Sequence, residues 1–185
     1  MVVSSPITIN HYGESFYSFL LSVKRASGVS DTVPIKVSKY LVEDLSLGDR
    51  IALQGQIRTY RKLVGGKSHL IIIFLATDVM QYEADFNSIN ITGFICTSPK
   101  HRVTPLGREI TDLILAVQSS QDRADYIPCI VWDKKSQFAA GLKTGARVKI
   151  SGRLQSRRYT KTLPDGSVEE RIAYELSVGT ILELK

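Results

Sequence analysis

The sequence contains one pattern twice, and this repeat limits the possible fold more than any other feature. FLLSV at 19–23 aligns with LILAV at 113–117, and GDRIALQGQIRTY at 48–60 then aligns with GARVKISGRLQSR at 145–157. Similar segments in the same order imply two copies of one supersecondary unit. We therefore expect two small domains, at residues 1–85 and 86–185.

The second copy has the alternation of apolar and polar residues that is typical of β-strands. Its expected elements are strands at 88–96, 109–118, 126–132, 147–161 and 171–178, a loop at 98–108 that contains Pro and Gly, and a helix at 136–143 capped by Ser136. Five strands with a helix between the third and the fourth is the order of the oligonucleotide-binding barrel, or OB fold. The predicted fold class is therefore all-β, with two tandem OB folds that each carry this short helix.

The first copy follows the same order less completely. Its expected elements are strands at 16–23, 33–37, 51–60 and 69–79, a helix at 38–47 and a tight turn at Gly65 and Gly66. The first strand is uncertain because residues 1–10 are few and include Pro6, which removes a backbone donor. We expect a degenerate domain whose barrel is either open or completed by another chain.

The segment RVKISGRLQSRRYTK at 147–161 carries the strongest functional signal. Val148, Ile150 and Leu154 alternate with residues that are mostly basic, and side chains two apart share one face of a strand. One face can therefore pack on a core while the other presents cations and Tyr159. Cations neutralise phosphates and flat rings stack on unpaired bases, so the pattern favours nucleic acid over an ordinary solvated surface.

Charge and composition agree with a nucleic-acid-binding domain in the second half. Residues 86–185 hold 15 basic and 10 acidic side chains, against 9 and 8 in residues 1–85. No apolar run approaches the roughly 20 residues of a membrane span, and the two cysteines are expected to be free thiols of a cytosolic protein. Isolated histidines and the absence of a nucleophile beside a base predict no enzyme, no metal and no cofactor.

The second copy resembles the bacterial single-stranded DNA-binding protein family. The resemblance lies in YIPCIVW, the helix after it, GARVKISGRLQSRRYTK and RIAYELSV. It implies that Tyr126, Trp132 and Tyr159 stack on bases, that two barrels per chain assemble as a homodimer, and that single-stranded DNA is the partner. The corresponding residues of the first copy are Thr32, Ser38 and Lys62, which cannot stack. The family's acidic C-terminal tail is not recognisable here.

The leading hypothesis is a sequence-nonspecific single-stranded DNA-binding protein. The alternatives are an OB-fold scaffold that holds other proteins, as an accessory factor in replication, recombination or a mobile element, and an RNA-binding protein. Arg108 either contacts phosphate or pairs with Glu109 or Asp112. The expected nucleic-acid-binding residues are Tyr126, Trp132, Tyr159, Arg102, Arg108, Lys134, Arg153, Arg157, Arg158 and Lys161, with Arg58, Tyr60, Arg61 and Lys62 as an electrostatic extension in the first copy.

Overall fold

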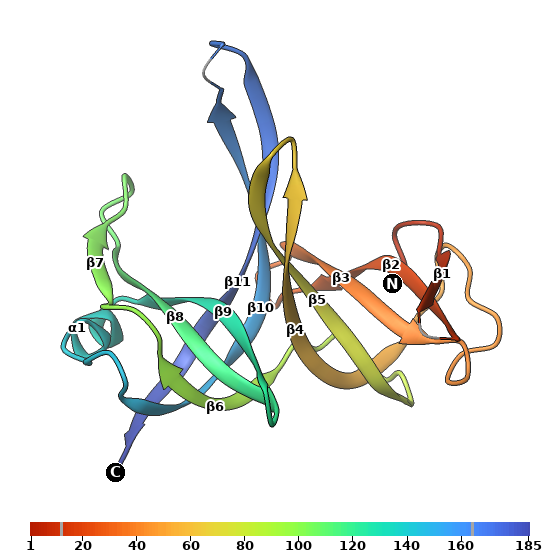
Figure 1. The fold of residues 1–185 in the computed structure, drawn as a ribbon, viewed down its shortest axis with the longest axis horizontal. Helices are drawn as coiled ribbons and strands as arrows, with labels where there is room; N and C mark the ends of the chain where they lie inside the picture. Colours follow the sequence, from red (N-terminus) through yellow and green to blue (C-terminus); the bar gives the residue numbers. More distant parts are fainter. Residues whose placement is uncertain (12, 164) are drawn as a thin grey trace. The chain divides into compact units, whose positions relative to one another are not determined.

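The computed structural model describes residues 1–11, 13–163 and 165–185, which form two compact units, Met1–Asn87 and Ser88–Lys185 (Figure 1). Each unit is built on one antiparallel-rich sheet, and each contains a single parallel strand pairing. Both units have the strand order of the OB fold.

The second unit is a closed barrel. Its sheet has the order β6-β10-β11-β9-β8-β7. The edge strand β6 also pairs with β8, and this pairing closes the sheet into a barrel. The alternating apolar residues of β10 face inward, where Val148, Ile150 and Leu154 are buried. The strands are β6 Ile89–Ile95, β7 Lys100–Val103, β8 Glu109–Ser120, β9 Arg123–Trp132, β10 Arg147–Thr162 and β11 Val168–Leu184.

A short hairpin occupies the segment that was expected to be only a loop. β7 pairs with the start of β8, and Thr104 and Arg108 close the turn between them through a backbone hydrogen bond of 2.8 Å. At the far end of the unit, β10 and β11 extend together as a long arm (Figure 1). The sequence predicts a turn at Pro164, Asp165 and Gly166, since Pro, Asp and Gly favour turns. Gly166 lies in the arm's turn with φ of 82°, and Pro164 lies outside the described residues.

The first unit has the same strands except at its beginning. The order of its sheet is β1-β2-β3-β5-β4. Among the described residues, no strand pairs with the outer edge of β4, so this sheet is not closed as the second one is. The strands are β1 Ile7–His11, β2 Glu14–Lys24, β3 Ser30–Ser38, β4 Ala52–Val64 and β5 Lys67–Met80.

The backbone hydrogen bonds of Val2 show which residue of the second unit it corresponds to. Val2 bridges to Leu21, receives a bond from the N–H of Gly48 and donates to Asp49. Ile95, the last residue of β6, pairs with Leu115 and makes the same two bonds with the backbone of 145–146. Val2 is therefore the counterpart of the end of β6, and β1 is the counterpart of β7.

The helix expected at 38–47 is wrong: the described residues of the first unit contain no helix. Tyr40 and Leu47 remain 98% and 62% exposed, so a helix here would bury no apolar face. Short helices depend on such burial. The segment instead forms isolated turns, in which the carboxylate of Asp49 accepts a hydrogen bond from the N–H of Ser46.

The helix of the second unit, α1 Lys134–Ala140, begins earlier than expected. Its N-cap is Asp133, and Ser136 lies inside the helix, buried against the barrel. Asp133 makes no side-chain cap bond because its carboxylate is held by Arg108 at 2.8 Å. The helix ends at Gly141 rather than at Gly145.

Glycines that match between the copies lie where two strands come closest. The pairing register shifts beside Gly55 and beside Gly152, so that each stands next to a bulge in the partner strand. A Cβ atom at Gly152 would lie 2.2 Å from the carbonyl oxygen of Ser177, and one at Gly55 would lie 2.1 Å from that of Leu75. Only glycine tolerates such an approach.

Replacing Gly152 with alanine is expected to lower the free energy of unfolding by about 1–3 kcal/mol, because paired backbone cannot move away from the added methyl group. Urea unfolding followed by far-UV circular dichroism measures the change. Gly141→Ala is the matched control, since its Cβ would make an ordinary contact of 3.5 Å. A Gly152→Ala variant as stable as the wild type would contradict the close approach.

Candidate nucleic-acid interface

One outer face of the second unit gathers aromatic and basic side chains. Tyr126 is the fourth residue of β9 and Trp132 its last, and both lie on the face opposite to buried Ile127 and Val131. Trp132 is six positions after Tyr126, which corresponds to about 20 Å along a strand. Tyr126 is 47% exposed and Trp132 is half-buried. The two rings are therefore accessible at separate points along one sheet face.

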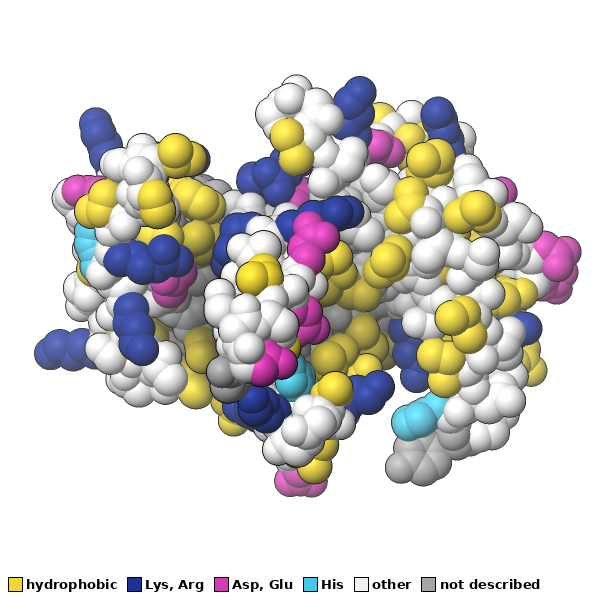
Figure 2. Space-filling view, turned by 90° about the horizontal axis from the view of Figure 1, so that it is seen from above, with side chains coloured by type: hydrophobic (Ala, Val, Ile, Leu, Met, Phe, Trp, Pro, Cys, Tyr) yellow, Lys and Arg dark blue, Asp and Glu magenta, His cyan; other side chains and the backbone are white. Residues whose placement is uncertain are grey.

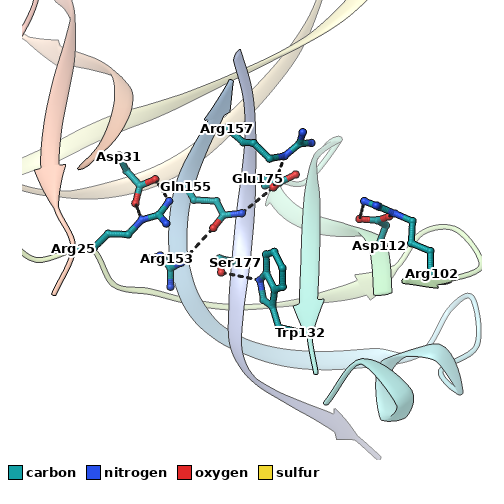
Figure 3. Close-up of polar contacts among 10 residues, drawn as sticks. All are labelled: Arg25, Asp31, Arg102, Asp112, Trp132, Arg153, Gln155, Arg157, Glu175 and Ser177. Atoms are coloured by element: carbon teal, nitrogen blue, oxygen red, sulfur yellow. Dashed lines mark hydrogen bonds and ion pairs between the residues drawn. The ribbon is translucent and has the colours of Figure 1, made fainter. Parts of the chain in front are cut away.

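Trp132 is held on this face from two sides. Its indole Nε1 donates a hydrogen bond to Oγ of Ser177 at 3.1 Å (Figure 3). The guanidinium of Arg108 lies over the indole, 4.5 Å from the ring centroid. Such a cation–π contact covers one face of the ring with positive charge. Trp132 is thus an oriented platform with a cation beside it.

Arg108 pairs with Asp133, whereas the sequence offered Glu109 or Asp112 as its partners, or phosphate as its ligand. Its Nε and Nη2 atoms donate to the two carboxylate oxygens of Asp133 at 3.3 and 2.8 Å. This hydrogen bonding lowers the pKa of Asp133 and raises that of Arg108. Since Arg108 comes from the β7–β8 turn, the pair connects that turn to the end of β9.

A chain of polar contacts begins at Arg153, opposite Ser177, and runs along β10 and β11 (Figure 3). Arg153 donates to Oε1 of Gln155 at 3.3 Å, and Gln155 donates to Oε1 of Glu175 at 2.8 Å. Nε of Arg157 lies 3.4 Å from the same oxygen of Glu175. Gln155 and Glu175 are almost fully buried, although they lie on the outer face. The two arginines are therefore oriented by neutral and acidic partners.

Gln155, Glu175 and Ser177 were missed by the sequence analysis. The signal that would have found them is the register of the hairpin: counting outward from its turn pairs Thr162 with Val168 and Gln155 with Glu175. The opposing strand was recognised, but its acidic residues were not placed against the basic ones.

The arm beyond this chain carries both signs of charge. Tyr159 is 37% exposed, and the guanidinium of Arg157 lies 5.6 Å from its ring centroid. Lys161 shares the face of Tyr159 and stands opposite Glu169. Arg158 lies on the other face, where it pairs with exposed Glu170 at 3.7 Å. Figure 2 likewise shows acidic side chains among the basic ones, so the surface is not uniformly cationic.

The remaining expected cations of the second unit lie at its periphery. Arg102 on β7 stands opposite Ile110 and binds the carboxylate of Asp112, with Nε to Oδ2 at 2.5 Å. Half of its side chain remains exposed. Lys134 is the first residue of α1 and is exposed. It follows Trp132 and Asp133 directly in the sequence.

The corresponding face of the first unit is chemically different. By strand register, Ile73 and Leu75 stand where the second unit has Glu175 and Ser177, and both are half-buried. Thr32 and Ser38 stand where it has Tyr126 and Trp132, and Lys62 corresponds to Tyr159. On β4, Arg58, Tyr60 and Lys62 share the outer face, whereas Arg61 lies on the opposite one.

One aromatic of this face escaped the sequence analysis. Phe16 pairs across the strands with Ser38, as Ile110 pairs with Trp132. The ammonium group of Lys36 lies 4.0 Å from its ring centroid. The first unit thus has a ring close to the place of Trp132, but on the neighbouring strand and covered by a lysine.

Comparison with known proteins agrees with this geometry. The model of the single-strand binding protein family matches residues 86–182, which is more than half of the sequence and includes the whole polar chain around Trp132. The chain belongs to this family. The match covers nearly all of the second unit and only the last two residues of the first.

Curated relatives match a shorter part of the chain than the family model does. Single-stranded DNA-binding protein 2 of Listeria innocua is 35% identical over 80 residues, which cover 40% of this chain and 50% of that protein. Single-stranded DNA-binding protein A of Bacillus subtilis is 34% identical over 80 residues, 46% of its length. The chain therefore spans about half the length of the curated relatives that it matches.

Solved structures match the whole chain, including the first unit. The wild-type single-stranded DNA binding protein from Thermus aquaticus aligns over 100% of this chain and 89% of its own, with a TM-score of 0.72 and 17% identity. A deletion mutant of the same protein aligns with a TM-score of 0.74 and 18% identity. At this identity the likeness shows the fold alone, and that fold extends through both units.

The described residues hold no group of three or more His, Cys, Asp or Glu side chains placed to bind a metal ion. Both cysteines are free, and burial raises the pKa of the Cys129 thiol. None of the helices in the described part of the chain is long and apolar enough to cross a membrane.

Proposed function

We propose that this family member binds single-stranded DNA without sequence specificity and so coats and protects it. The observation that carries the proposal is the outer face of the second unit, where Trp132 lies between Arg108 and the chain that orients Arg153 and Arg157. The names of the curated relatives support the same partner. The chain acts by binding and not by catalysis.

Two physical terms would act together on this face. Bases would stack on Tyr126, Trp132 and Tyr159, each stacked base contributing about 1–3 kcal/mol whatever its identity. Phosphates would be neutralised by cations along the strands, with Arg102, Lys134, Arg153, Arg157 and Lys161 as the candidates of the second unit. Because neither term reads a base edge, both act on any single strand.

Binding is expected to weaken steeply with salt. If about five phosphates are neutralised, the slope of log K against log salt is about −3.5, and affinity falls roughly a hundredfold between 50 and 200 mM salt. Titration with fluorescent oligo-dT measures the slope, and a duplex of the same length is the control. Equal binding to duplex and single strand, or no salt dependence, would overturn the proposal.

The first unit favours a second candidate function, as a surface that holds another protein. The apolar Ile73 and Leu75 stand in place of Glu175 and Ser177 of the second unit. Tyr40, in the loop after β3, is exposed. A protein partner that co-purifies, together with no measurable affinity for oligo-dT, would favour this scaffold over DNA binding.

Three parts of the proposal come from the family resemblance and the bacterial relatives. They are a homodimer as the assembly, the cytoplasm as the compartment, and DNA rather than RNA as the partner. Competition between oligonucleotides of matched sequence separates DNA from RNA within the same titration.

A further inference from the structure

The ring of Trp132, proposed to stack on a base, is covered on one of its faces. The guanidinium of Arg108 lies 4.5 Å from the indole centroid, which is within range of a cation–π contact. The Arg108 side chain is itself 52% exposed, so the guanidinium lies between the indole and solvent. A base needs an open ring face to stack. Stacking on the outer face of Trp132 therefore requires Arg108 to move aside.

The position of Arg108 over the ring is set by the carboxylate of Asp133. Nε and Nη2 of Arg108 donate to its two oxygens at 3.3 and 2.8 Å. Both side chains are about half exposed, and ion pairs of this kind are weak because water competes for both charges. The planar fork of a guanidinium fits phosphate oxygens as well as carboxylate oxygens. A phosphate of a bound strand can therefore replace the carboxylate of Asp133 and keep the same pattern of hydrogen bonds.

The backbone of Asp133 has an unusual conformation. Its φ is 55° and its ψ is −136°, and among the described residues it is the only one other than glycine with positive φ. Its N–H donates to the carbonyl of Glu109 and its carbonyl accepts from the N–H of Ser136, both at 2.8 Å. Residues with a Cβ rarely adopt such angles, and those that do cluster at binding sites, where the surrounding structure holds them. The conformation therefore points to a role for the Asp133 carboxylate beyond ending β9.

We propose that Asp133 is a positioning residue of the single-strand site. In the free protein it holds Arg108 over Trp132; in the complex Arg108 exchanges this carboxylate for a phosphate of the strand and so uncovers the ring. The exchange adds Arg108 to the cations that neutralise the strand. One movement thus couples phosphate binding to base stacking. This inference rests on the proposed single-strand binding and specifies how the free site opens.

Arg108→Gln tests whether the exchange takes place. Each phosphate neutralised on a single strand contributes about −0.7 to the slope of log K against log salt, so this variant should bind oligo-dT with a slope about 0.7 shallower than wild type. Arg50→Gln is the matched control, because Arg50 also lies near a ring, 5.8 Å from the centroid of Tyr82, but in the first unit. It should leave the slope unchanged. A wild-type slope in Arg108→Gln would overturn the inference, since Arg108 would then remain on Asp133 in the complex.

Asp133→Asn tests what holds Arg108 in the free protein. Asparagine keeps the size of the side chain and tolerates positive φ, so the change removes the charge and leaves the backbone in place. Acrylamide, a neutral quencher, should quench the fluorescence of Trp132, the single tryptophan, more strongly in this variant than in wild type. Affinity for oligo-dT should rise roughly two- to fivefold, because the exposed ion pair no longer has to be broken.

Asp112→Asn is the matched control for this variant, since it removes the carboxylate that pairs with Arg102 on the same outer face. It should leave acrylamide quenching unchanged. Unchanged quenching in Asp133→Asn as well would overturn the positioning role, because removal of a negative charge alone changes affinity but not access to the ring. If wild-type protein does not bind oligo-dT, the proposed function itself fails. A failure of the exchange alone leaves binding intact, with the same salt slope in wild type and Arg108→Gln.

Discussion

Replacing Trp132 and Tyr159 together with alanine will weaken binding of single-stranded DNA by about 2–6 kcal/mol, since each stacked base contributes about 1–3 kcal/mol. The two rings lie on the outer face of the second unit, and each has an arginine beside it, Arg108 at 4.5 Å and Arg157 at 5.6 Å from the ring centroid. Alanine removes the ring and leaves the cation, so the loss isolates stacking from phosphate neutralisation.

Fluorescence anisotropy of labelled oligo-dT measures this loss, and quenching of Trp132 in the wild type reports the stacking directly. Trp132→Phe is a control that keeps a ring but loses the bond to Ser177, so it should retain most of the affinity. Tyr60→Ala is the matched control in the first unit, where the loss should be much smaller. Equal losses from the two units, or no quenching at saturation, would show that the binding face lies elsewhere.

The second large effect concerns stability. Arg25→Ala is expected to lower the free energy of unfolding by about 3–5 kcal/mol, because it removes one partner of a buried ion pair. Asp31 is 1% exposed, and Arg25 binds both of its oxygens, with Nε 2.6 Å from Oδ2 and Nη2 2.5 Å from Oδ1. This bonding raises the pKa of Arg25, which keeps it charged throughout the accessible pH range.

Urea unfolding followed by far-UV circular dichroism measures the change. Arg158→Ala is the control, because Arg158 and Glu170 form an exposed pair at 3.7 Å, and such pairs contribute less than about 1 kcal/mol. If Arg25→Ala cost no more than Arg158→Ala, the Arg25 and Asp31 pair would not be the buried anchor that its geometry indicates.

Several features of this protein were predictable because their signals are local. The alternation in 147–161 predicted which side chains of β10 are buried, since strand geometry has a period of two residues. Gly65 and Gly66 predicted the β4–β5 turn, where both have positive φ. The repeat predicted that whatever fold one half adopts, the other half adopts in the same order.

The sequence by itself therefore determined the two OB folds, the strands other than β1 and β7, and the basic, aromatic character of one face. Only the tertiary structure decided which partners those side chains meet: Arg108 over Trp132, Glu175 beneath Arg157, and no helix at 38–47. The physical reason is the distance along the sequence over which each interaction acts. Periodicity and turn chemistry depend on neighbours a few residues apart, whereas ion pairs, ring contacts and helix burial depend on residues that the folded sheet brings together from distant segments.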